Sequence, residues 1–352
     1  LAAVLFSVGM IANAFRVIPM ALRRYDISSK VGAIQGAVRS IGLILLVLAH
    51  LSVLYLVVWE VIVIGAVLVA QVLIARWMLP GLRWLPSMSL TGIREIIGYS
   101  MYSFLTHIFL MMWREGPKLL MGNRIGTTGV AYFGTPDSIS NRLHMIVVSA
   151  IETLVPRFSA PEQRESGKLL LTLATWSAFA CGAILYVPLA VLMPDLLRLW
   201  INPEFARQSG LVGQILTFSL VGPLGYSAIA TLFRGINKPA FVTAVMVVVA
   251  ILVVVASLLL MPGWGVVGVA WAYLMGTAAW LGGLVHGWRW LYGQGSLLVL
   301  LRVAGLPLAV GCGLVFAQTS LRNWWGEPGW IGLFLMGGVF ATMGAVVVVG
   351  CD

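Results

Sequence analysis

Long uninterrupted apolar segments constrain this chain more than any other feature. The stretch VTAVMVVVAILVVVASLLLM, residues 242–261, carries no charge and is apolar on every face of a helix. About 20 such residues are enough for an α-helix to cross the hydrocarbon core of a bilayer. A transmembrane strand would instead be about ten residues long and alternate apolar with polar side chains. The segment therefore predicts a membrane-spanning helix and not a strand of a barrel.

Apolar segments of this length recur along the whole chain. The sequence is 60% hydrophobic and only 10% charged, whereas soluble domains are about 25% charged. We therefore expect an all-α polytopic membrane protein. The predicted transmembrane helices span approximately 1–20, 31–51, 56–78, 98–121, 128–150, 168–193, 209–234, 240–262, 266–290, 297–319 and 330–350.

The connections between these helices differ in charge. Every second connection is basic, and these together hold thirteen of the 22 Lys and Arg residues, against five in the opposite set. Cytoplasmic loops carry the excess of positive charge, so we expect the basic set and the C-terminus in the cytoplasm. The net charge of +10 then has a membrane explanation, and it does not by itself indicate a nucleic-acid partner.

The three cysteines, Cys181, Cys312 and Cys351, are widely separated and lie in or at the ends of apolar spans. This spacing indicates neither a disulfide framework nor a metal cluster. We expect no metal and no cofactor.

Four arginines fall inside predicted spans: Arg16, Arg39, Arg114 and Arg142. An arginine at the centre of a transmembrane helix costs about 2.5–3.5 kcal/mol on insertion scales, so such residues usually face a bundle interior or a water-filled cavity. Arg16 lies near the cytoplasmic end, where its long side chain can reach the headgroups. The other three arginines are candidates for binding an anionic ligand.

The stretch MMWREGPKLLMGNRIG, residues 111–126, belongs to the most highly charged span. At 100° per residue, His107, Arg114 and Lys118 fall on one face of that helix. A guanidinium binds phosphate oxygens through two parallel hydrogen bonds, so this face could hold a phosphate-bearing ligand. The alternative is that Arg114 pairs with Glu115 or with a neighbouring helix, while Lys118 reaches the outer headgroups.

Two further spans carry polar residues at helical spacing. Gln35 and Arg39 share a face of the second span. The fifth span has two polar stripes, and one of them can serve only interhelical hydrogen bonds. We predict that Arg39 and Arg142 are further cavity cations and that Gln35 and Asn141 are polar cavity residues. The stripes are Thr135, Ser138, Arg142 and Ser149, and Asp137, Asn141 and His144.

Glu60, Glu115 and Asp137 are acidic residues near the ends of predicted spans. Desolvation favours the protonated form of a carboxyl group. These residues are therefore candidates for taking up a coupling proton or sodium ion. Contact with headgroups or with a neighbouring cation is the alternative for each of them.

The order of motifs along the chain resembles the polysaccharide transporter family, the lipid-linked oligosaccharide flippases of the multidrug/oligosaccharidyl-lipid/polysaccharide exporter superfamily. No single motif is specific, but together they extend over nearly the whole chain. They are AFRVIPMALRRYDISSKVGAIQGAVRSIGLILL (14–46), GYSMYSFLTHIFLMMWREGPKLLMGNRIGTTGVAYFG (98–134), SAIETLVPRFS (149–159), LWINPEFARQSGLVGQILTFSLVGPLGYSAIATLFRGINKPAF (199–241) and GWGVVGVAWAYLMGTAAW (263–280).

This resemblance implies a two-lobed plan of fourteen helices with both termini in the cytoplasm. If GYSMYSFL, residues 98–105, is aligned with the start of the second lobe, the chain supplies helices four to fourteen. Residue 1 lies inside an apolar span, so we expect an N-terminally truncated sequence. The implied divisions are the rest of an N-terminal lobe (1–80), an inter-lobe linker (81–97), a C-terminal lobe (98–292) and two appended helices (293–352).

The resemblance also implies a transport function rather than an enzyme activity. We expect export of an undecaprenyl-diphosphate-linked oligosaccharide across the bacterial inner membrane, for O-antigen, capsule or exopolysaccharide, by alternating access through a cationic cavity. Implied partners are the lipid bilayer, a coupling proton or sodium ion and polysaccharide-assembly proteins. The alternatives are a cation-coupled multidrug exporter, a peptidoglycan-precursor flippase and, more distantly, a membrane glycosyltransferase or polymerase.

Overall fold

In the computed structural model, every regular element of the described residues is a helix. The structure describes residues 2–22, 24–81, 90–152, 164–293, 296–325 and 328–350. This confirms the predicted all-helical membrane class. The helices are α1 (Ala2–Ala21), α2 (Tyr25–Leu48), α3 (Val53–Met78), α4 (Leu90–Arg124), α5 (Thr127–Glu152), α7 (Arg164–Trp200), α8 (Pro203–Ser219), α9 (Val221–Gly235), α10 (Pro239–Tyr292), α11 (Ser296–Trp325) and α12 (Trp330–Gly350).

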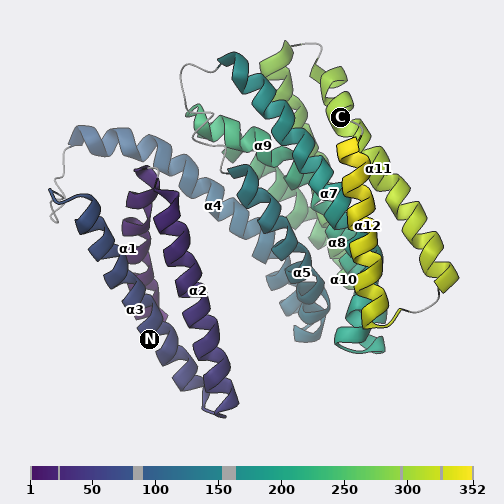
Figure 1. Cartoon of the computed structure of the whole chain (residues 1–352), viewed down its shortest axis with the longest axis horizontal. Coiled ribbons are helices and arrows are strands. Elements are labelled where there is room, and N and C mark those ends of the chain that lie inside the picture. Colours follow the sequence, from purple (N-terminus) through teal and green to yellow (C-terminus); the bar gives the residue numbers. More distant parts are fainter. Residues whose placement is uncertain are drawn as a thin grey trace. The chain divides into compact units, whose positions relative to one another are not determined.

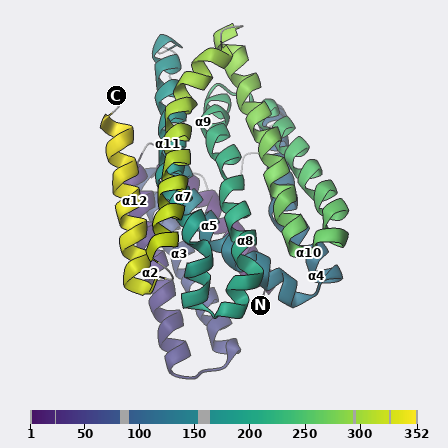
Figure 2. The ribbon, with the colours of Figure 1, turned by 90° about the vertical axis from the view of Figure 1, so that its right-hand side faces the viewer.

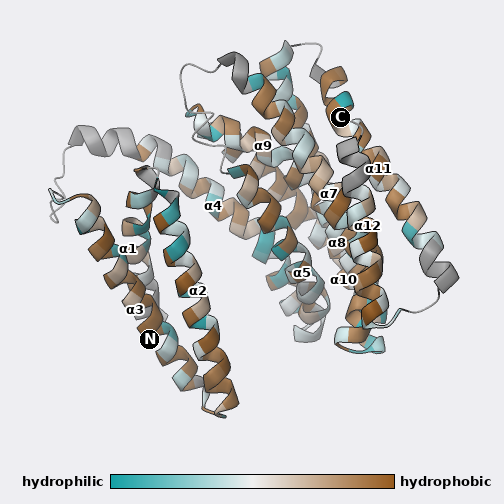
Figure 3. Ribbon diagram, in the orientation of Figure 1, coloured by the Kyte–Doolittle hydropathy of each residue, from teal (hydrophilic) through white to brown (hydrophobic). Residues whose placement is uncertain are grey.

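All eleven predicted spans lie on these helices. Within the described part of the chain, six helical segments, with α8 and α9 counted as one, are long and apolar enough to cross a membrane, and hydrophobic residues surround much of their circumference (Figure 3). α4 and α5 are not among the six, because charged residues interrupt α4 and hydroxyl, amide and charged residues interrupt α5. The chain is a multi-pass membrane protein, and α4 and α5 are two of its more polar helices.

The chain forms two compact units, residues 1–89 and 90–352. In the first unit, α1, α2 and α3 lie side by side, with α3 packed against both of the others (Figure 1). In the second, α7 packs against α5, α8, α9, α11 and α12, while α10 packs against α4, α8 and α9. Residues 82–89 of the predicted inter-lobe linker, and 153–163 of a predicted cytoplasmic connection, lie outside the described residues.

α10 is a hairpin of two helical limbs. Its 54 residues are interrupted at Gly265, which has φ +57°, a left-handed conformation that glycine adopts without steric cost. A Cβ on Gly276 would meet Val253, and one on Gly283 would meet Val245. The limbs therefore run antiparallel in close contact (Figure 2), as the separate spans predicted at 240–262 and 266–290 require.

Prolines inside the helices leave carbonyl groups that need other donors, because proline has no N–H and the carbonyl four residues earlier loses its partner. Pro117 frees the carbonyl of Trp113, which accepts a 2.8 Å hydrogen bond from Tyr273 Oη. Pro223 frees the carbonyl of Ser219, where α8 ends, and that carbonyl accepts a 2.9 Å hydrogen bond from Thr277 Oγ1.

Tyr273 and Thr277 lie one turn apart on the second limb of α10. This limb therefore supplies the donors for two breaks in neighbouring helices. The break between α8 and α9 also divides the span predicted as one helix at 209–234.

Candidate functional site

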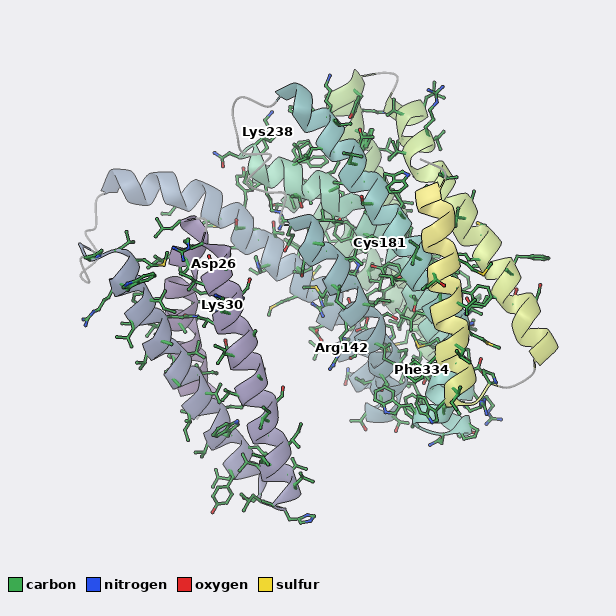
Figure 4. The ribbon with its side chains drawn as sticks, viewed as in Figure 1. Asp26, Lys30, Arg142, Cys181, Lys238 and Phe334 are labelled. Carbon is green, nitrogen blue, oxygen red and sulfur yellow. The ribbon has the colours of Figure 1, made fainter. Side chains whose placement is uncertain are left out.

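An open groove of about 800 Å³ runs between α5 and α7. One of the two polar stripes of α5 faces it, with Thr135, Ser138 and Arg142 along the wall. Arg142 is exposed, and it lies along α5 (Figure 4). The groove thus combines two hydroxyl groups and a cation with an apolar surface. Its full lining is Ala131, Gly134, Thr135, Ser138, Ile139, Arg142, Leu143, Ile146, Leu189 and Trp200.

Arg142 has no partner of its own in this groove. Among the residues that the structure describes, its guanidinium makes no hydrogen bond and no ion pair. An arginine held within a membrane helix without a counter-ion is a functional candidate by default. Its five N–H donors in a planar fork suit phosphate or carboxylate oxygens.

The other polar stripe of α5 is turned into the protein and is fully paired. Asp137 is 7% exposed, and its Oδ2 lies 3.0 Å from Lys118 Nζ on α4. Asn141 Nδ2 donates to Asp137 Oδ1 at 2.6 Å. On the same side, His144 Nδ1 lies 2.7 Å from Tyr186 Oη on α7. These contacts tie α5 to α4 and α7.

Lys118 is shared by two carboxylates, because its Nζ also lies 3.4 Å from Glu115 Oε2. The alternative pairing of Glu115 with Arg114 is not what the structure shows. Lys118 and two of the acids considered for ion coupling, Glu115 and Asp137, thus form one ion-pair cluster. The roles of Lys118 in ligand binding and of Asp137 in ion coupling stay predictions, and either role would require this cluster to open.

Arg114 stands beside the cluster without joining it. Its side chain lines a cavity of about 10 Å³ together with Asp137, Asn141 and Tyr273, a space that suits about one water molecule. In the described part of the chain, no hydrogen bond or ion pair engages its guanidinium. Arg114 is therefore a second intramembrane cation available to a ligand or to ordered water.

The predicted site residues of the first unit lie in two separate groups. Arg39 Nε lies 2.7 Å from Glu60 Oε1, which joins α2 to α3. Gln35 lines a separate cavity of about 20 Å³ with Arg16 and Gln71. The predicted cation Arg39 and the predicted coupling acid Glu60 are thus partners of one another.

The remaining candidate, His107, is exposed on α4, and its Nδ1 lies 2.9 Å from the carbonyl of Ser103. Sequence reasoning noted Thr135 and Ser138 without choosing them as site residues, although their spacing with Arg142 already marks one helical face. Trp200, which also lines the groove, is not among the site residues that the sequence predicts. Within the described residues, no group of three or more His, Cys, Asp or Glu is placed to hold a metal ion.

Comparisons with known proteins agree with the fold and the motifs. Residues 2–169 match a family model described as polysaccharide biosynthesis protein. A comparison with curated proteins found no match. Among solved structures, the fold is similar to that of lipid II flippase MurJ in an inward closed conformation. The TM-score is 0.66 at 12% sequence identity, over 96% of this chain and 70% of that chain.

The identity to the solved structure is low, so that likeness shows the fold alone, whereas the family match rests on the sequence. Both agree with the resemblance carried by the order of motifs. Together, the family match over residues 2–169 and the shared fold support the polysaccharide transporter and flippase family that the order of motifs resembles.

Proposed function

We propose that this protein moves an undecaprenyl-diphosphate-linked oligosaccharide across the bacterial inner membrane, for O-antigen, capsule or exopolysaccharide synthesis. Arg142 in the groove between α5 and α7 is the observation that carries this proposal. The family match to polysaccharide biosynthesis proteins supports the substrate class. Alternating access of the groove to the two sides of the membrane, with a cytoplasmic C-terminus, is part of the proposal.

The chemistry of the groove fits an amphipathic, anionic glycolipid. Arg142 would bind the diphosphate through paired, charge-assisted hydrogen bonds. The Thr135 hydroxyl can donate to and accept from sugar hydroxyls, while the Ser138 hydroxyl donates to the carbonyl of Gly134 and can accept from a sugar hydroxyl. Ile139 and Leu189 give the groove an apolar side, while the polyprenyl tail stays in the bilayer.

A peptidoglycan-precursor flippase is the second candidate, because the fold is similar to that of a protein described as a lipid II flippase. A multidrug exporter for cationic drugs is less well supported, since the ionisable residue that lines the groove is an arginine and would repel a cation. Coupling to a proton or sodium ion would use Asp137 or Glu60. Each of these acids is paired with a basic residue in the structure.

The first prediction concerns Arg142. Arg142→Ala, in the full-length protein produced in its host, should lower export of surface glycan about tenfold or more while membrane abundance stays normal, because a hydrogen bond to a charged group contributes about 1.5–3 kcal/mol. Arg142→Lys keeps the charge but loses the planar fork, so we expect partial export. Surface glycan and membrane abundance are measured together for each variant.

Arg207→Ala is the matched control. Arg207 is also an arginine of the second unit, but its side chain is 73% exposed and pairs with Glu204, so export should not change. Normal export by Arg142→Ala would contradict the proposal. Rescue of cells depleted of their peptidoglycan-precursor flippase, without restoration of surface glycan, would select the second candidate.

A further inference from the structure

Trp200 differs from the buried tryptophans of the second unit. It is the last residue of α7, its side chain is 58% exposed, and it lines the same groove as Arg142. Trp113 and Trp280 pack their rings against each other at a centroid distance of 5.8 Å. In the described residues, Trp200 has no such aromatic partner. Its ring is therefore free to pack against a ligand in the groove.

The helix directions place Trp200 at one end of the groove. His144 of α5 contacts Tyr186 of α7, and both Pro136 of α5 and Met193 of α7 pack against Gly213. Increasing residue numbers on α5 thus match decreasing numbers on α7, so the two helices run antiparallel. Trp200 accordingly lies near Ala131, roughly 16 Å along the helix axis from the level of Arg142 at 1.5 Å per residue.

The side chains between these ends are suited to sugars. Thr135 and Ser138 line the groove between Ala131 and Arg142, and their hydroxyl groups can exchange hydrogen bonds with sugar hydroxyls. One face of a pyranose ring consists of C–H groups, which carry partial positive charge. The face of an indole carries partial negative charge. An exposed indole at the end of a hydroxyl-lined groove is therefore a platform for a sugar ring.

We propose that the Trp200 end of this groove is a carbohydrate subsite, in which a sugar distal to the diphosphate stacks on the indole. This inference rests on the proposed function, in which Arg142 holds the diphosphate. It adds that the protein recognises the glycan as well as the lipid-linked phosphate. The substrate must then be an oligosaccharide long enough to reach from Arg142 to Trp200.

Trp264 tests the competing explanation that Trp200 is only an anchor at the membrane interface. Trp264 is 60% exposed, close to the value for Trp200, and lies beside the bend of α10 at Gly265. It is not part of the lining of the groove. An interfacial role would make the two tryptophans equivalent, whereas a carbohydrate subsite would separate them.

The experiment measures binding to the purified full-length protein in lipid nanodiscs. The two probes are undecaprenyl diphosphate and the same lipid carrying the host's oligosaccharide repeat. Trp200→Ala should weaken binding of the glycan-bearing probe about tenfold, as expected for loss of an aromatic platform, and leave binding of the bare diphosphate unchanged. Trp200→Phe should retain most of the affinity, and Trp264→Ala should match the wild type with both probes.

Equal affinity of Trp200→Ala and wild type for the glycan-bearing probe would overturn the subsite, and so would equal losses for both probes. A loss in Trp264→Ala as large as that in Trp200→Ala would also overturn it. Arg142→Ala should lose affinity for both probes. If it binds both as the wild type does, or if the wild type binds neither, the proposed function fails, which is a different outcome from failure at Trp200 alone.

Discussion

On one face of α5, Ser138 and Arg142 line an open groove, and the guanidinium makes no ion pair in the described residues. On a second face, Asp137 is buried and bound by Lys118 and Asn141, while His144 contacts Tyr186. Both stripes have the residue spacing of an amphipathic helix. They differ in whether neighbouring helices supply their partners.

The two faces of α5 show that polar residues in a membrane helix can serve two purposes. A buried polar group costs several kcal/mol unless it is hydrogen-bonded, and a buried charge costs more unless it is paired. On the Asp137 face, neighbouring helices supply the hydrogen-bond and ion-pair partners, so this face joins helices. On the Arg142 face, water or a ligand must supply these partners, so we propose that this face binds a ligand.

The largest expected effect on stability comes from the paired face. Lys118→Met would leave the Asp137 carboxylate buried without its cation, which should lower the free energy of unfolding by about 3 kcal/mol. The double change Lys118→Met with Asp137→Leu replaces the pair by apolar side chains and should recover most of that loss. Denaturant unfolding in detergent measures all three proteins. An unchanged stability for Lys118→Met would show that the paired face is not structural.

A smaller effect is expected at the hydrogen bond between α5 and α7. Tyr186→Phe removes the hydroxyl that lies 2.7 Å from His144 Nδ1, and the unsatisfied buried ring nitrogen should cost about 1–2 kcal/mol. Ser138→Ala on the groove face should change stability by less than about 0.5 kcal/mol, because Ser138 is exposed and, within the described residues, its hydroxyl bonds its own helix at the carbonyl of Gly134. Similar losses for both variants would remove the distinction between the faces.

The sequence alone predicts much of this fold, because the length and hydropathy of the apolar segments are enough to identify the helices. Residues 242–261 could not form another transmembrane element, and the glycines and proline around residue 265 separate two spans of similar length. The break at Leu220 was harder to predict. Pro223 indicates a break in the helix. The carbonyl of Ser219 that this proline leaves without a partner is bound by Thr277, which lies 58 residues further along the chain and cannot be identified from the local sequence.

The site was predictable only as a set of residue types. Arg39 and Glu60 are 21 residues apart, and Lys118 and Asp137 lie on different helices, so their pairing depends on tertiary packing. The two stripes of α5 give equal helical periodicity, and nothing local decides which of them faces a groove. The sequence does not predict that Trp200 lines a groove, because the other wall of the groove is formed by α5, a separate helix whose position depends on tertiary packing.

Two serines on α5 provide the most direct measurement of the difference between its faces. Ser138 is exposed to the groove, while Ser140 is 1% exposed and lies 2.7 Å from Thr217 Oγ1. Two residues along a helix point about 200° apart. Ser138→Cys and Ser140→Cys are each introduced into the full-length protein after replacement of its native cysteines, and the rate of reaction with a water-soluble thiol reagent is measured.

The thiol at position 138 should react readily, and the undecaprenyl-diphosphate-linked oligosaccharide should slow that reaction. The thiol at position 140 should react at least tenfold more slowly and show no response to the glycolipid, because packing excludes water from a buried side chain. Equal reaction rates at the two positions, or a reaction at 138 that the glycolipid does not slow, would contradict the assignment of the Arg142 face to ligand binding.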